Sequence, residues 1–338
     1  MRSFPARIIF APIILIQTMI NRDLIRSKVL QTVYAHQMNE AQSLESAEKE
    51  FRKSLDQSYE LYHLLLLLIP AITDHAEERI EMGRNKYLPT EEEKNPNTRF
   101  IDNSFVSQLR VNSELRQAVD KFKLSWTVRE EHSKKQNDFR PHPIIKTLYE
   151  QIAGSPFYDE YMTAGSCTYE DDKEIWRKIF RQIIARGTEL EEALEERSIY
   201  WNDDIDIVCT FVTKTIKQFE AENGADQALL PQYREDDDLD FALKLLKAAL
   251  QHGQEYRDLI TGAIQNWELD RLALMDLLIM QTALAEIIEI PDIPVSVSLN
   301  EYINLAKIYS TEKSSVFING TLDAIVKRLR SENRLFKS

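Results

Sequence analysis

Apolar residues recur along this chain with the spacing of an amphipathic helix, and this periodicity limits the possible folds more than any other feature. In Ser314–Leu329, for example, Ile318, Leu322 and Ile325 fall at i, i+4 and i+7, which places them on one helical face. Few segments alternate apolar and polar residues as strands do, and only 8 of the 338 residues are glycine. We therefore predict an all-α protein.

An Asn-Gly pair lies inside that last helix, although Asn-Gly is typical of a hairpin turn. A glycine within a helix costs about 1 kcal/mol relative to alanine, so its presence needs a reason. We predict that Gly320 lets the helix that begins near Ser298 approach closely, while Asn319 bonds a neighbouring backbone or a bound ligand. Ser314 and Ser315 are placed to cap the start of this helix.

Composition, capping residues and helix-breaking residues divide the chain into segments. Asn21 is placed to cap a first helix that runs to about Asn39, and Pro70 should kink or interrupt the second. The expected segments are an extension at 1–18, N-terminal helices at 19–89, a helical insertion at 90–238, a C-terminal helical bundle at 239–330 and a basic tail at 331–338.

Helical patterns are strongest in the C-terminal segment. One helix is predicted to run from Phe241 to Ala263. The next, around residues 272–286, is apolar nearly all round, which indicates a central, buried helix. Ser298 and Glu301 have the spacing of a capping box at the start of the following helix.

The first eighteen residues resemble a weak signal peptide. Arg2 and Arg7 precede the apolar run Ile8–Ile16, which is too short to span a membrane, and no A-x-A-like cleavage site follows. Met19 then opens a well-patterned helix. We favour Met19 as the natural start over an export signal.

Charge is distributed unevenly. The 42 basic and 55 acidic residues give a net charge of −13, yet both ends are basic. Arg22, Arg26 and Lys28 lie in the first helix, and the residues after Lys327 are also basic. The acidic middle is typical of solvated helix faces. Such a distribution permits nucleic-acid binding at the ends despite the acidic total.

The chain lacks the common catalytic motifs. It has no G-x-G-x-x-G, Walker loop, G-x-S-x-G or H-E-x-x-H, and its 6 histidines are scattered. Asp74-His75 has metal-ligand chemistry, but no second cluster supports it. Cys167 and Cys209 suggest neither a disulfide framework nor a zinc site. We expect a cytoplasmic protein without enzymatic activity, cofactor or metal.

Several motifs, taken in order, resemble a known family. N-W-E-L-D-R-L opens a long apolar helix that ends in Glu286, I-P-V starts at Ile293, and F-I-N-G-T-L-D spans Phe317–Asp323. Their order and spacing are similar to those of NusB, the bacterial transcription antitermination factors. The basic first helix, with Tyr34 and Gln37 near its end, resembles that family's N-terminal helix. The resemblance covers about 19–85 and 239–326, and the extended length resembles Bacteroidetes forms.

That resemblance implies two small helical bundles packed together and a binding role. The implied partners are the boxA element of ribosomal RNA transcripts, the ribosomal protein NusE and the RNA polymerase antitermination complex. Asp23 and Gln281 depart from the family pattern. The implied RNA contacts are Arg22, Arg26, Lys28, Tyr34, Lys313 and Phe317, the implied NusE contacts are Tyr34 and Asp276, and the implied structural residues are Trp267, Asn319 and Gly320.

Other interpretations stay open at this point. Tyr34 and Phe317 are equally consistent with half-buried core residues, and Arg22 and Arg26 with an ordinary solvated face. A second functional hypothesis is a protein-only scaffold whose acidic insertion recruits a basic partner. Neither hypothesis involves a membrane.

Overall fold

The computed structural model describes residues 18–39, 43–130, 139–234, 236–264 and 272–337. It is almost entirely helical, as predicted, and its described strands form one two-stranded antiparallel hairpin. The N-terminal helices are α1 (Arg22–Met38) and α2 (Leu44–Arg84). The C-terminal helices are α11 (Asp236–Gln251), α12 (Gly253–Ala263), α13 (Leu274–Glu289), α14 (Val295–Tyr309) and α15 (Glu312–Ser331).

Shorter elements fill the middle of the chain. They are α3 (Glu91–Lys94), α4 (Ser104–Val111), α5 (Ser113–Phe122), β1 (Thr127–Arg129), β2 (Phe139–Pro141), α6 (Pro143–Ala153), α7 (Pro156–Thr163), α8 (Tyr169–Gln182), η1 (Ile184–Arg186), α9 (Thr188–Glu195), η2 (Ile199–Trp201), α10 (Ile205–Gln218) and η3 (Ala221–Asp226).

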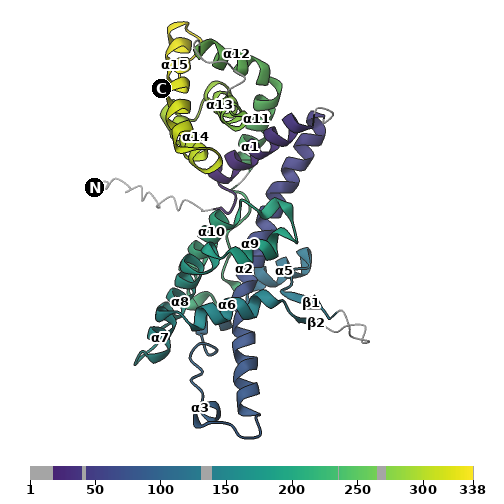
Figure 1. Ribbon diagram of the computed structural model, residues 1–338, viewed down its shortest axis with the longest axis vertical. Helices are drawn as coiled ribbons and strands as arrows, with labels where there is room; N and C mark the ends of the chain where they lie inside the picture. Colours follow the sequence, from purple (N-terminus) through teal and green to yellow (C-terminus); the bar gives the residue numbers. More distant parts are fainter. Residues whose placement is uncertain (1–17, 40–42, 131–138, 235, 265–271, 338) are drawn as a thin grey trace, which may run out of the picture.

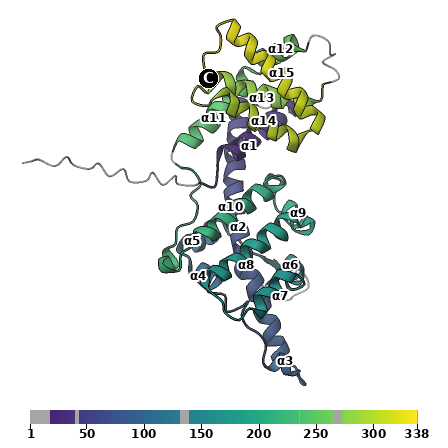
Figure 2. The same ribbon diagram turned by 90° about the vertical axis from the view of Figure 1, so that its left-hand side faces the viewer.

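Helix α2 connects two groups of helices. Figure 1 shows α11–α15 gathered at one end of the molecule, with α1 lying beside them and leading into α2. Helices α4 to α10 surround the middle of α2, and α3 lies near its far end, an arrangement that the turned view in Figure 2 also shows. Pro70 does not interrupt α2, which continues through it to Arg84. Of the two predicted effects the interruption is therefore wrong, and the kink stays a prediction.

The C-terminal bundle is built around α13. All residues from Leu278 to Ile287 are buried, which confirms the prediction of a central helix. Helices α11, α12, α14 and α1 pack against it. Because α13 presents apolar side chains in every direction, neighbours must cover it on all sides.

The middle helices share their core with α2. The Tyr62 hydroxyl lies 2.6 Å from the hydroxyl of Thr215 on α10, and the Trp126 indole donates to the Leu64 carbonyl at 2.8 Å. The Trp201 indole likewise donates to the Gln57 carbonyl. These buried contacts satisfy polar atoms that would otherwise be costly to bury, so they fix the insertion on the middle of α2.

Helix boundaries show where local signals succeeded and failed. Asn21 caps α1 by accepting from the Leu24 amide, as predicted. The capping box at Ser298 is wrong, because α14 begins at Val295 and the Ser298 side chain points into the core. Thr311, and not Ser314 or Ser315, caps α15. The helix expected over Phe241–Ala263 is two helices, α11 and α12, that meet at His252.

The first described residues lie beside the segment that precedes α11 and joins the insertion to the C-terminal helices. The Met19 amide donates to the Pro231 carbonyl and the Ile20 amide to the Gln232 carbonyl, and both side chains are fully buried. The hypotheses about residues 1–17 lie outside the described residues. No helix in the described part of the chain has the length and apolar character needed to cross a bilayer.

Candidate nucleic-acid interface

Two of the three predicted RNA-binding cations of α1 are buried inside the protein. The Arg26 guanidinium makes two hydrogen bonds to the Glu286 carboxylate, at 2.8 and 2.9 Å, and Arg26 is only 3% exposed. Burial by itself would lower the pKa of Arg26, but the bond and charge of Glu286 outweigh it and the pKa is raised. Arg26 therefore serves the core, and both the implied RNA contact and the alternative of a solvated face are wrong for this residue.

Lys28 also forms a buried ion pair, in this case with a residue of the insertion. Its ammonium lies 2.8 Å from the Asp204 carboxylate and donates to the Tyr200 carbonyl, and both charged side chains are at most 2% exposed. Asp204 also accepts from the Ser58 hydroxyl on α2. Burial raises the pKa of Asp204, although Lys28 opposes the shift. A cation held in this way is not available to a phosphate.

Arg22 is the one α1 cation of the predicted set that stays exposed. Its guanidinium lies 5.0 Å from the centre of the Phe241 ring on α11, within the range of a cation–π interaction. That contact orients the side chain without neutralising its charge. Arg22 thus remains a candidate phosphate contact.

The other predicted interface residues lie on elements that meet at one end of the bundle. The Gln31 amide donates to the Tyr309 hydroxyl at 2.9 Å, which joins α1 to the end of α14. The Ser310 hydroxyl donates to the Asp276 carboxylate, which joins the α14–α15 connection to the start of α13. Tyr34 follows Gln31 on the same face of α1.

We call this region the junction face and define it by its side chains. Tyr34 is 39% exposed, and Phe317 is partly buried against the core. Asp276 is buried, so it supports the junction from within and does not reach the surface. The side chains that line the junction face are Tyr34, Met38, Ile308, Lys313, Val316 and Phe317.

Exposed apolar side chains on the junction face indicate a contact surface. Met38 is 62%, Ile308 69% and Val316 74% exposed, and they come from the end of α1, the end of α14 and the start of α15. Apolar groups collected at one place mark interaction sites more often than scattered ones do. An exposed aromatic ring can also stack on a base, and an exposed lysine can neutralise a phosphate.

The predicted structural residues have different outcomes. Trp267 lies outside the described residues. Asn319 is exposed on α15. A methyl group built on Gly320 would meet nothing within 4 Å, so the prediction of a close helix approach there is wrong. Helices α14 and α15 do pack together, but Gly320 points away from that contact.

The close approach occurs instead at Gly253, which the sequence analysis did not single out. A methyl group there would lie 2.8 Å from the amide nitrogen of Gln281. That amide is fixed by a bond to the Ala249 carbonyl and by the Arg257 guanidinium. Gln281, a departure from the family pattern, therefore fills the space between α11, α12 and α13.

The sequence analysis also did not identify Glu286 as a buried carboxylate that collects several polar partners in the core. It accepts from Arg26, from the Ser298 hydroxyl at 2.8 Å and from the Tyr302 hydroxyl at 3.3 Å. A charged residue on an otherwise apolar helix was the available signal, because such a group must find partners when buried. Its partner could not be chosen from sequence, since Arg26 lies 260 positions away.

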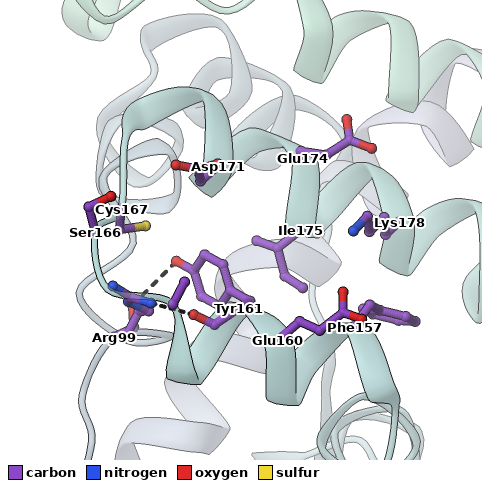
Figure 3. Close-up of a pocket in the computed structure, with 11 residues that line it drawn as sticks. Arg99, Phe157, Glu160, Tyr161, Ser166, Cys167, Asp171, Glu174, Ile175 and Lys178 are labelled. Atoms are coloured by element: carbon purple, nitrogen blue, oxygen red, sulfur yellow. Dashed lines mark hydrogen bonds between the residues drawn. The ribbon is translucent and has the colours of Figure 1, made fainter.

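Several polar side chains around a small hollow in the insertion are bonded within the protein. Figure 3 shows this cavity of about 190 Å³ between α7, α8 and the segment before α8, with Arg99 bonded to the Tyr161 carbonyl. The buried Asp172 accepts from the Tyr161 hydroxyl and the Cys167 thiol. Burial raises the pKa of Cys167, which disfavours a reactive thiolate. No cluster of metal-ligating side chains occurs among the described residues.

Comparison with known proteins identifies relatives of the chain. A model of the NusB family matches residues 205–327. The transcription antitermination protein NusB of Salinibacter ruber is 35% identical over 133 residues, which are 38% of this chain and 83% of that protein. NusB of Clostridium botulinum is 32% identical over 155 residues, which are 46% of this chain and 96% of that protein.

The chain belongs to the NusB family. NusB of Chloroherpeton thalassium is 42% identical over 99 residues, which are 29% of this chain. That match spans about half of the relative's own length, 47%. No solved structure matches the chain. The family match starts at α10 and reaches into α15, so it contains every junction-face residue that comes from α14 and α15.

Proposed function

We propose that this NusB-family protein is a transcription antitermination factor that binds single-stranded boxA-type RNA together with NusE. The observation that carries the proposal is the junction face, where Tyr34, Lys313 and Phe317 lie on elements joined by direct contacts. The supporting context is the resemblance to antitermination proteins named NusB. The RNA polymerase antitermination complex is the assembly in which the pair would act.

The division of labour on the junction face follows from its chemistry. Tyr34 offers a half-exposed ring on which a base can stack, an interaction worth about 1–3 kcal/mol per base. Lys313 on the junction face and Arg22 at the start of α1, outside that face, are the exposed cations of the predicted set. Together they would neutralise about two phosphates. The exposed Met38, Ile308 and Val316 suit an apolar patch of the protein partner.

The buried state of Arg26 and Lys28 lowers the expected electrostatic contribution. Neutralising about two phosphates of a single strand gives a slope of about −1.4 in log K against log salt. Such binding is weak by charge alone. Stacking and the bound NusE surface must therefore supply most of the affinity, which predicts that NusE and RNA bind cooperatively.

The test is a titration of a short boxA-like RNA at two salt concentrations, with and without NusE of the same organism. Tyr34→Ala and Lys313→Ala should each weaken binding about tenfold, consistent with one lost stack or one lost phosphate contact. Lys327→Ala is a matched control, because Lys327 is exposed on the same helix about 21 Å away by helical rise. Arg26→Ala is unsuitable, since it would disturb the core.

The second hypothesis, a protein-only scaffold, gives a different result in the same experiment. NusE would bind, RNA would give no saturable signal at either salt concentration, and Lys313→Ala would be silent. RNA binding that Lys327→Ala weakens as much as Lys313→Ala would place the RNA elsewhere on the bundle.

A further inference from the structure

A groove in the insertion is independent of the junction face. Two adjoining hollows, of about 300 and 460 Å³, lie where α5, the β1–β2 hairpin and α6 meet the second half of α2. Leu67, Pro70 and Val119 line both hollows, so the two form one continuous surface. We call it the α2 groove. Figure 1 shows α5, α6 and the hairpin on the same stretch of α2.

The walls of the α2 groove are mainly apolar. Leu115 and Ile145 are buried and form its floor, and Trp126 is held at its side by the bond to the Leu64 carbonyl. Phe139 stands at its rim and is 59% exposed. A concave apolar surface with an exposed aromatic residue at its edge is suited to receive apolar side chains of another chain.

One polar atom in the α2 groove has no partner in the described part of the protein. The Nε2 atom of His75, a residue that lines the larger hollow, is buried and makes no hydrogen bond. Its ring is held edge-on by Tyr149 at 5.5 Å. Burial lowers the pKa of His75, so the neutral ring offers one donor or acceptor. A buried polar atom without a partner calls for a bound group.

The charged side chains around the α2 groove are unevenly distributed. Asp74 and Glu78 line the larger hollow, which has no cation among its described lining residues, whereas Arg110 and Arg116 line the smaller hollow together with Asp120. Arg110 is already paired with Asp74 and with Glu77. The surrounding segment, 90–238, holds 31 acidic against 20 basic residues. Its field therefore attracts cations and repels nucleic acid.

We propose that the α2 groove binds a basic, amphipathic peptide segment of a protein partner. Apolar side chains of that segment enter the two hollows, and its lysines or arginines face Asp74, Glu78 and Asp120. A backbone or side-chain polar group of the segment bonds His75 Nε2. This site is separate from the proposed RNA surface and gives the insertion a recruiting role of its own.

The test uses a designed probe and the full-length protein. A fluorescent helical peptide of about 16 leucine and lysine residues spans about 24 Å, and its leucine–glutamate counterpart has the same shape with opposite charge. The Leu/Lys peptide should bind saturably and the Leu/Glu peptide at least about tenfold more weakly. Val119→Glu should abolish binding, because it places a charge on the wall shared by both hollows.

A surface variant keeps the test informative if Val119→Glu fails to fold. Glu78→Lys combined with Asp120→Lys changes only exposed side chains and should weaken the Leu/Lys peptide about tenfold while improving the Leu/Glu peptide. Gln117→Lys, exposed on the same α5, is the matched control with little expected effect. RNA binding measured in parallel should be unchanged in all of these variants, which separates this proposal from the proposed function.

Three results would overturn the proposal. Equal binding of the two peptides would show that charge selects nothing at the α2 groove. Loss of binding in Gln117→Lys would place the probe elsewhere on α5. A concentration-dependent dimer that Val119→Glu converts to monomer would assign the groove to a second copy of this chain.

Discussion

The two buried ion pairs of α1 show how one helix serves two different parts of the molecule. Arg26 points into the C-terminal bundle and meets Glu286, whereas Lys28 points to the insertion and meets Asp204. The Glu286 carboxylate accepts two hydrogen bonds from the Arg26 guanidinium and one each from the Ser298 and Tyr302 hydroxyls. Asp204 has one lysine and one serine hydroxyl as partners. Cations that looked like a ligand surface therefore hold the two parts together.

The largest effect should come from breaking the pair in the bundle. Glu286→Ala removes the two-bond partner of the buried Arg26 guanidinium and leaves it only the longer contact to the exposed Asp23 carboxylate, at 3.3 Å. This should lower the free energy of unfolding by about 3–5 kcal/mol. Denaturant titration measures this loss. The double variant Arg26→Met with Glu286→Leu should recover most of it, because neither charge remains; a double variant as unstable as Glu286→Ala would contradict this account.

A neutral buried group on α2, packed near Phe122 of the insertion, offers a contrast with both ion pairs. Burial lowers the pKa of His63 from 6.5 to about 4, so the folded protein keeps this ring uncharged. The unfolded chain takes up the proton first as pH falls, and stability present above pH 6.5 is lost progressively towards pH 4. At pH 4 the loss reaches about 3 kcal/mol.

The measurement for His63 is the free energy of unfolding between pH 7 and pH 4. His63→Leu should flatten the profile, since the titrating group is gone. An unchanged slope in His63→Leu would assign the acid sensitivity to other groups.

Breaking the Lys28–Asp204 pair, which links α1 to the insertion, should lower the free energy of unfolding by a smaller amount. Asp204→Ala leaves the Lys28 ammonium with the Tyr200 carbonyl as a remaining partner, and it also removes a carboxylate whose burial was costly. We expect a loss of about 2 kcal/mol, less than for Glu286→Ala in the same denaturant series. A loss as large as that of Glu286→Ala would mean that the two pairs contribute equally.

Two glycines provide the smallest and most closely matched comparison. Gly253→Ala pushes a methyl group against the fixed Gln281 amide and should cost about 1–2 kcal/mol. Gly320→Ala meets open space within a helix and should stabilise the fold by about 0.5–1 kcal/mol. Thermal unfolding of the two variants should therefore move in opposite directions. A destabilising Gly320→Ala would restore the packing explanation for that glycine.

Some features of the fold and the candidate site could be predicted because their signals are local. Helix periodicity depends only on spacing, so the buried character of α13 and the Asn21 cap were predicted correctly. The Ser298 prediction failed because its hydroxyl has a stronger partner, Glu286, than a helix-start amide. Tyr34 and Lys313 were predicted as interface residues from a resemblance. In the structure α14 links their helices, since it bonds to α1 and packs against α15; their binding role stays a prediction.

The sequence by itself determined that this protein is helical, that α13 is central and that the ends carry the positive charge. These properties depend on composition and on spacings of a few residues. Only the tertiary structure decided which charges remain available to a ligand. Arg22, Arg26 and Lys28 are nearly equivalent in the sequence, but a cation stays free or becomes neutralised according to the carboxylates that the fold brings to it. Glu286 and Asp204 come from positions far along the chain, and no local pattern specifies such a meeting.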